Sequence, residues 1–102
     1  MAHRLTAQAE ADLDQIWSYI VEESGNIEIA RRQIAAITDR FCLLANHPQL
    51  GRARDFDLGS GRRSYPVDRY VIIYRIEGAD VLILRVAHGS RDIEALFGRR
   101  LV

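Results

Sequence analysis

The chain of 102 residues contains one cysteine, no lysine and no apolar run that approaches the length of a membrane span. The single thiol, Cys42, excludes an internal disulfide and a zinc site built from cysteines. Residues 1–6 lack the charged-then-apolar plan of a secretory signal. No glycine-rich phosphate loop and no His/Cys/Asp cluster with metal-ligand spacing is present, so we expect neither a metal nor a cofactor. These absences favour a protein of the reducing cytoplasm with no membrane association.

Charge is balanced overall but divided unevenly along the chain. Fourteen arginines offset fourteen acidic residues, and this zero sum argues against a protein that coats nucleic acid. Residues 1–51 hold four arginines and seven acidic residues, a net charge of −3, whereas residues 52–102 hold ten arginines and seven acidic residues, a net charge of +3. With 48% apolar residues, the composition is typical of one globular domain, which we place at residues 1–102.

Two amphipathic helices are predicted in the first half, after a short strand at residues 2–5. The first helix begins after Thr6, a residue suited to cap it, and the break at residues 24–26 leads into the second, which ends near His47 because Pro48 follows. Apolar residues recur at intervals of three and four: Ala9, Leu13, Ile16 and Ile20, then Ala30, Ile34, Ile37, Phe41 and Leu44. The short connection predicts an antiparallel hairpin. Cys42 is expected to pack in it as a small hydrophobe.

The second half predicts a sheet. Residues 47–61 are expected to form a loop, and the period then drops to two over Arg63–Val67, Tyr70–Ile76 and Val81–His88. Short connections favour antiparallel pairing, and Pro66 marks the first of these strands as an edge or an interrupted strand. A short closing helix is expected at Asp92–Phe97. The predicted fold class is α+β, with the helical hairpin packed on one face of a twisted antiparallel sheet.

Arg85 and His88 are the residues in this sheet whose side chains are most suited to a role in binding or catalysis. Arg85 interrupts an apolar strand, and simple alternation places it on the face of Val81, Ile83 and Ala87. It either forms an ion pair with an acidic residue or contributes to an anion-binding floor.

Metal-free RNA cleavage needs a proton-transferring group and cations around the phosphate. His88, with Arg62, Arg85 and Arg91, supplies those residue types, although spacing alone does not show that the four meet.

The order of motifs along the chain resembles the ParE-type toxins of the ParE/RelE toxin–antitoxin superfamily. The resemblance rests on Leu5-Thr6 with Ala11-Asp12-Leu13 and Ile16–Ile20, His47-Pro48 with Gly51-Arg52, Gly61-Arg62-Arg63, Tyr70–Arg75 and Ile83–Asp92. It implies a toxin held inactive by a cognate antitoxin whose C-terminal segment lies along the hairpin and sheet. ParE members block DNA gyrase and have no established catalytic residues, whereas RelE members are ribosome-dependent endoribonucleases with clustered basic side chains. The absence of lysine, and Phe97 where a tyrosine acid would help, depart from the nuclease pattern.

This resemblance leads to a prediction of function by binding. We expect a toxin that inhibits DNA gyrase, has no catalytic residues and binds no specific DNA sequence without its antitoxin. Trp17 and Val21, on the flank of the first apolar stripe, either seat a partner helix or pack in the core. The antitoxin-binding candidates are Trp17, Val21, Glu22, Arg75 and Arg85.

Two alternatives stay open. The first is a RelE-like endoribonuclease that uses Arg62, Arg85, His88 and Arg91. The second is a degenerate toxin domain that binds only an antitoxin.

Overall fold

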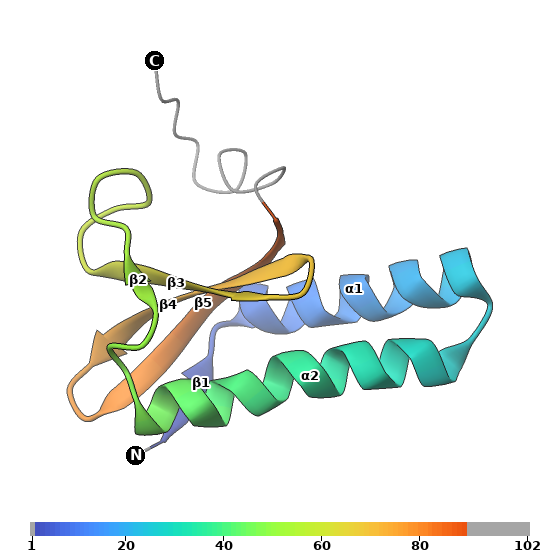
Figure 1. Ribbon diagram of the computed structural model, residues 1–102, viewed down its shortest axis with the longest axis horizontal. Helices are drawn as coiled ribbons and strands as arrows, with labels where there is room; N and C mark the ends of the chain where they lie inside the picture. The colour runs from blue at the N-terminus through green and yellow to red at the C-terminus, as the bar shows by residue number, and fades with distance from the viewer. Residues whose placement is uncertain (1, 90–102) are drawn as a thin grey trace.

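The computed structural model describes residues 2–89, which form two helices packed on one face of a five-stranded sheet (Figure 1). In chain order the elements are β1 (His3–Leu5), α1 (Ala7–Ser24), α2 (Ile27–Asn46), β2 (Arg52–Ala53), β3 (Arg62–Val67), β4 (Tyr70–Glu77) and β5 (Asp80–His88). The strand order is β1-β5-β4-β3-β2. The α+β fold class is therefore confirmed. The predicted helix at Asp92–Phe97 lies outside the described residues.

The helix boundaries follow the capping residues predicted from the sequence. The Thr6 side chain accepts a hydrogen bond from the Ala9 N–H at 3.0 Å, which satisfies one of the free donors at the start of α1. Gly25 ends α1 in the left-handed conformation with φ of 65°, and Asn26 then caps α2 by accepting from the Glu28 N–H. Cys42 differs from its prediction. It is exposed, because α2 directs Phe41 and Leu44 inward and turns Cys42 toward solvent.

The sheet is mixed rather than wholly antiparallel. β1 pairs in parallel with β5, with His3 opposite Val81 and Leu5 opposite Ile83. Parallel pairing is open to this strand because both helices and three further strands separate it from β5 along the chain. At the other edge, β2 adds two residues from the segment predicted as a loop and covers only part of β3. Pro66 lies beyond that pairing, as predicted for an edge position.

A bulge in β5 changes which residues share a face. Tyr74 pairs with Ile83 and Ile73 pairs with Arg85, so Leu84 is an extra residue in β5. Val86 consequently joins Ile83 in the core beneath the helices, while Ala87 packs on the opposite face. The prediction that Ala87 and Ile83 share a face was wrong, because strict alternation does not survive the extra residue.

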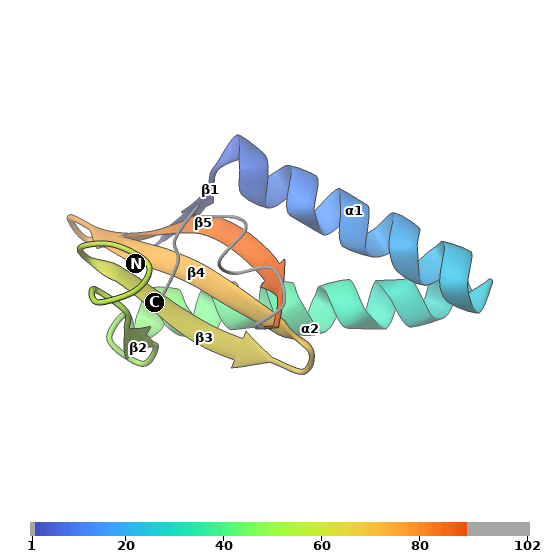
Figure 2. The same ribbon diagram turned by 90° about the horizontal axis from the view of Figure 1, so that it is seen from above.

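The main core lies between the helical hairpin and the sheet. Its largest fully buried side chains include Phe41 and Ile37 from α2 and Tyr74 and Ile72 from β4. A smaller cluster of Leu58, Ile73 and Ala87 lies on the face without helices. Within residues 2–89, neither helix is apolar over a stretch that would cross a membrane. Both helices run past the sheet, so their joined ends project from it (Figures 1 and 2).

Candidate interaction surfaces

Large apolar side chains are exposed where α1 and α2 join. Tyr19 on α1 is 56% exposed, and Ile27 and Ile29 on α2 are 55% and 42% exposed. We call this region the hairpin end, defined by Tyr19, Ile27 and Ile29. Since it projects beyond the sheet, no strand covers it (Figure 2). A group of exposed apolar side chains on a projecting element is typical of a protein-binding surface.

Trp17 and Val21 lie on α1, close to the hairpin end, and both are half-buried. The half-buried side chains that pack against the main core are Leu5, Leu13, Ile20, Ile34, Ala36 and Tyr65, so the two predicted contact residues are not among them. At about 100° per residue, their flank lies on the other side of the buried stripe from Tyr19. This placement favours the interpretation that they are accessible to a partner over plain core packing.

Glu22, the next predicted contact residue, is exposed in the last turn of α1. It has no ion pair among residues 2–89, and the last turn of α1 holds no basic residue. A carboxylate at a helix C-terminus faces the negative end of the helix dipole. The hairpin end therefore combines apolar surface with an uncompensated negative charge.

A hollow of about 550 Å³ separates the hairpin end from the turn between β3 and β4. The Gln33 side chain donates to Asp68 at 3.2 Å across it, which ties α2 to that turn. Apolar and polar side chains line the hollow: Tyr19, Ile20, Glu23, Ser24, Ile29, Gln33, Asp68, Arg69 and Tyr70. Its mixed walls suit a side chain with both an apolar stem and a polar end.

Arg85 is engaged inside the fold. Its guanidinium donates to both carboxylate oxygens of Asp12 on α1, at 2.9 and 3.0 Å, and the backbone N–H of Val86 donates to the same carboxylate at 2.9 Å. The hydrogen bonds that Arg85 donates to Asp12 raise the pKa of Arg85 above its ordinary value. β1 pairs with β5 only as far as Ile83, so the Val86 N–H has no strand beside it. The Asp12 carboxylate supplies the acceptor for this N–H instead. The structure thus supports the ion-pair interpretation of Arg85.

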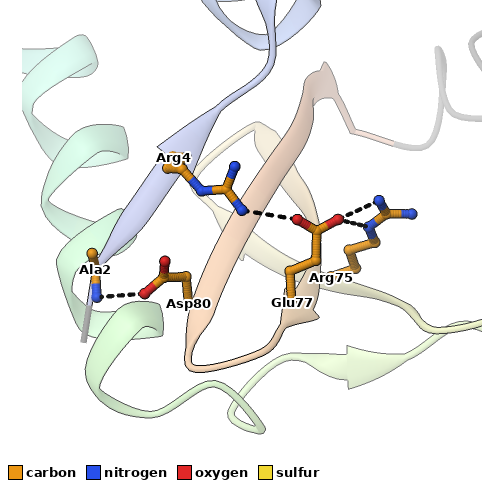
Figure 3. A network of polar contacts seen from close by, with 5 residues as sticks. All are labelled: Ala2, Arg4, Arg75, Glu77 and Asp80. Carbon is orange, nitrogen blue, oxygen red and sulfur yellow. Dashed lines mark hydrogen bonds and ion pairs between the residues drawn. The ribbon is translucent and has the colours of Figure 1, made fainter.

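Arg75 lies in an exposed network at the far end of β4 (Figure 3). Its guanidinium donates to Glu77, and Arg4 from β1 donates to the other oxygen of that carboxylate at 2.8 Å. The hydrogen bonds from Arg75 and Arg4 hold the pKa of Glu77 below its usual range. The Asp80 carboxylate, which accepts from the Ala2 N–H in the same network, balances the second guanidinium, so these residues carry no net charge.

The residues of the predicted RNA-cleaving group are not gathered at one place in residues 2–89. His88 is opposite Tyr70 on the helix-covered face, and the two rings meet edge to face with centroids 5.6 Å apart. Arg62 is opposite Arg75, which lies five residues beyond Tyr70 in β4. Arg62 and His88 are therefore separated by about 16 Å along the strand direction. An odd separation in a strand also places the two on opposite faces. Arg91 lies outside the described part of the chain.

Arg62 instead contacts the loop that joins β2 to β3. Its Nη1 donates to the Leu58 carbonyl at 2.7 Å. The His88 Nδ1 is buried, and no group of the described residues hydrogen-bonds to it. Within residues 2–89, no three His, Cys, Asp or Glu side chains are grouped as metal ligands would be. The four predicted RNA-cleaving side chains are therefore not assembled at one point in the described part of the chain.

The β2–β3 loop carries a feature that the sequence analysis missed. Phe56 is 61% exposed, and the guanidinium carbons of Arg52 and Arg54 lie 5.8 and 5.9 Å from its ring centroid. Both distances lie within reach of a cation–π interaction. The only signal in the sequence is the spacing Arg-x-Arg-x-Phe. We call these three residues the Phe56 platform.

Comparisons with known proteins give one answer over nearly the full chain. A family model described as the ParE toxin of type II toxin-antitoxin system, parDE, matches residues 4–93. Toxin ParE3 of Caulobacter vibrioides is 34% identical over 95 residues, which is 93% of each chain. Toxin ParE1 of the same organism is 34% identical over 96 residues, covering 94% of this chain and 97% of its own. A solved structure described as the chromosomal ParDE TA system from P. aeruginosa superposes with a TM-score of 0.76 at 25% identity, over 88% of this chain and 97% of that one.

Proposed function

The chain belongs to the ParE toxin family of type II toxin–antitoxin systems, and from this premise we propose that it inhibits DNA gyrase by binding and is neutralised by a cognate antitoxin. The observation that best supports action by binding is the hairpin end, an apolar surface that no other described element covers.

The antitoxin part of the proposal rests on the chemistry of this surface. Tyr19, Ile27 and Ile29 offer apolar area, and Trp17 adds an aromatic side chain of the kind that often anchors interfaces. The uncompensated Glu22 complements a basic residue on the partner. We therefore propose that the antitoxin segment over the hairpin end is apolar with an adjacent arginine or lysine.

The gyrase part rests on family membership, and one observation favours it over RNA cleavage. Arg85 is bound to Asp12, and Arg62 and His88 are on opposite faces of the sheet. A nuclease needs its proton-transferring group within hydrogen-bond reach of the reacting atoms and cations around the same phosphate.

Pulse labelling after induction of the chain alone tests the target. We expect thymidine incorporation to fall before methionine incorporation, because a gyrase inhibitor stops DNA synthesis first. Purified toxin is then expected to inhibit supercoiling by gyrase. An early fall of methionine incorporation, with supercoiling unaffected, would contradict the proposal and favour the ribosome-dependent nuclease.

Charge reversal on α1 tests the antitoxin surface. Glu22→Lys is expected to weaken antitoxin binding about tenfold, because it opposes a basic partner residue. It should not destabilise the fold, since a positive charge suits a helix C-terminus. Asp39→Lys, an exposed position on α2 outside the hairpin end, is the control and should leave affinity unchanged. Equal affinities for both variants, measured by titration calorimetry, would remove Glu22 from the interface.

A further inference from the structure

The Phe56 platform is exposed although the loop around it is firmly built. Arg54 forms hydrogen bonds with Asp57 through its Nε and with Ser64 through its Nη1, both at 3.0 Å. The Arg54 guanidinium holds the pKa of Asp57 below its usual range. Leu58, two residues after Phe56, is 1% exposed and packs against Ile73 beneath the loop. Phe56 is therefore held in solvent by a fixed backbone.

Two further contacts close the loop. The Asp55 carboxylate accepts from the Gly61 N–H, and Arg62 donates to the Leu58 carbonyl. Gly59 has φ of 117°, and a Cβ there would lie 2.7 Å from Arg62 Nη1, so the loop closes around that guanidinium. A loop ordered in this way loses little entropy when a partner binds its tip, which favours affinity.

The charges at the loop tip favour a protein over a nucleic acid as the occupant. At the tip itself, Arg52 and Arg54 are offset by Asp55 and Asp57. The further cation of the loop, Arg62, is half-buried and directed at the Leu58 carbonyl. Nucleic-acid affinity depends on a surplus of cations that neutralise phosphates, and this tip has none. Phenylalanine with flanking arginines is instead a composition enriched at the centres of protein interfaces.

Arg52 specifies the chemistry of the partner further. It is exposed and forms no ion pair with any of residues 2–89, whereas the charge of Arg54 is used by Asp57. A carboxylate on the partner, beside the pocket that receives the Phe56 ring, would complement it.

We propose that the Phe56 platform docks into an apolar pocket bordered by a carboxylate on the protein that the toxin inhibits, and that the antitoxin binds elsewhere. The identification of this protein as the toxin's target rests on the proposed function. The β2–β3 loop and the hairpin end lie at opposite ends of the molecule in both views, which separates the two surfaces (Figures 1 and 2).

Two variants of the full chain test this separation, each with one exposed apolar side chain replaced by alanine. Phe56→Ala is expected to abolish growth arrest on induction and to raise the concentration needed to inhibit gyrase about thirtyfold, as for an interface hot spot. Its antitoxin affinity and Tm should equal those of the wild type. Ile29→Ala, at the hairpin end, should show the reverse, with weaker antitoxin binding and unchanged toxicity. Arg52→Glu should reduce inhibition about tenfold, and Phe56→Tyr should retain it.

The outcomes separate the platform from the proposed function. Growth arrest by Phe56→Ala at the wild-type level overturns the platform, and so does a loss of antitoxin affinity in that variant. The platform is also overturned, in favour of nucleic acid, if the wild type alone binds a labelled single-stranded oligonucleotide and Phe56→Ala does not. If the wild type arrests growth without inhibiting gyrase while Phe56→Ala does not arrest growth, the platform stands and the gyrase assignment fails. A wild type that arrests no growth overturns both.

Discussion

Asp12 is the residue whose removal should most disturb the packing of α1 on the sheet. Its carboxylate accepts two hydrogen bonds from Arg85 and one from the Val86 N–H. The Asp12 side chain is 10% exposed and the Arg85 side chain 23%. Asp12→Ala therefore leaves three donors without their acceptor, two on the Arg85 guanidinium and one the buried backbone N–H of Val86.

The magnitude follows from these burials. Removing one partner of a buried, hydrogen-bonded ion pair costs about 3–5 kcal/mol. Since Arg85 retains some access to water, we expect the lower end, about 3 kcal/mol, and a Tm lower by roughly 12–24 °C in a domain of this size. Asp12→Asn keeps an oxygen for the Val86 N–H and should cost about half as much.

Urea unfolding followed by tryptophan fluorescence measures the loss, because Trp17 is the only tryptophan and lies on α1. Asp14→Ala on the same helix is the control and should cost less than about 0.5 kcal/mol, since Asp14 is exposed. A double-mutant cycle of Asp12→Ala with Arg85→Met should give a coupling free energy of about 2 kcal/mol. A cost for Asp12→Ala below about 1 kcal/mol would refute the reasoning.

Three further changes test other parts of the fold. Tyr74→Phe removes a hydroxyl that accepts from the Gly51 N–H at 2.8 Å and should cost about 1–3 kcal/mol in urea unfolding; a neutral result would contradict the buried hydrogen bond. Phe41→Ala should cost about 3–5 kcal/mol by the same assay, and a cost below 1 would place the ring outside the core. The hydrogen bond from Arg54 lowers the pKa of Asp57, so the stability from this pair is present above the unfolded pKa near 3.8 and is lost as pH falls through the lower folded value. Asp57→Asn should therefore show a smaller loss of unfolding free energy between pH 5 and pH 2 than the wild type, as measured by urea titrations. If the unfolding free energies of the two proteins fall in parallel with pH, the Arg54–Asp57 pair does not contribute this stability.

Local signals in the sequence were sufficient for the helices and for four of the five strands in residues 2–89. Thr6 and Asn26 cap helices because their side chains satisfy nearby backbone donors, and Pro48 follows the end of α2 because its ring disfavours helical geometry before it. The apolar stripe of α2 identified Ile37 and Phe41 as core residues, and both are fully buried. Each of these features depends on residues within a few positions of one another.

The features that the sequence did not reveal depend on distant residues. The parallel pairing of β1 with β5 joins residues almost eighty positions apart. The bulge at Leu84 is defined only by how β5 pairs with β4. The partner of Arg85 could have been any of several acidic residues. Asp12 was selected by the packing of α1 against the open edge of β5, which no periodicity encodes.

The same dependence explains why charged candidates for a binding surface are hard to rank from sequence. Arg75, Arg85 and Arg52 look alike in the printed chain, but Arg85 is bound to Asp12 and Arg75 to Glu77. Arg52 forms no close ion pair among residues 2–89, although its charge helps to lower the pKa of Asp57, and its guanidinium lies by the exposed ring of Phe56. An arginine already paired within its own chain gains less from a partner's carboxylate, because that contact replaces an existing one. Recognition is therefore expected where the fold leaves a charge beside exposed apolar surface, and of these three arginines Arg52 meets both conditions.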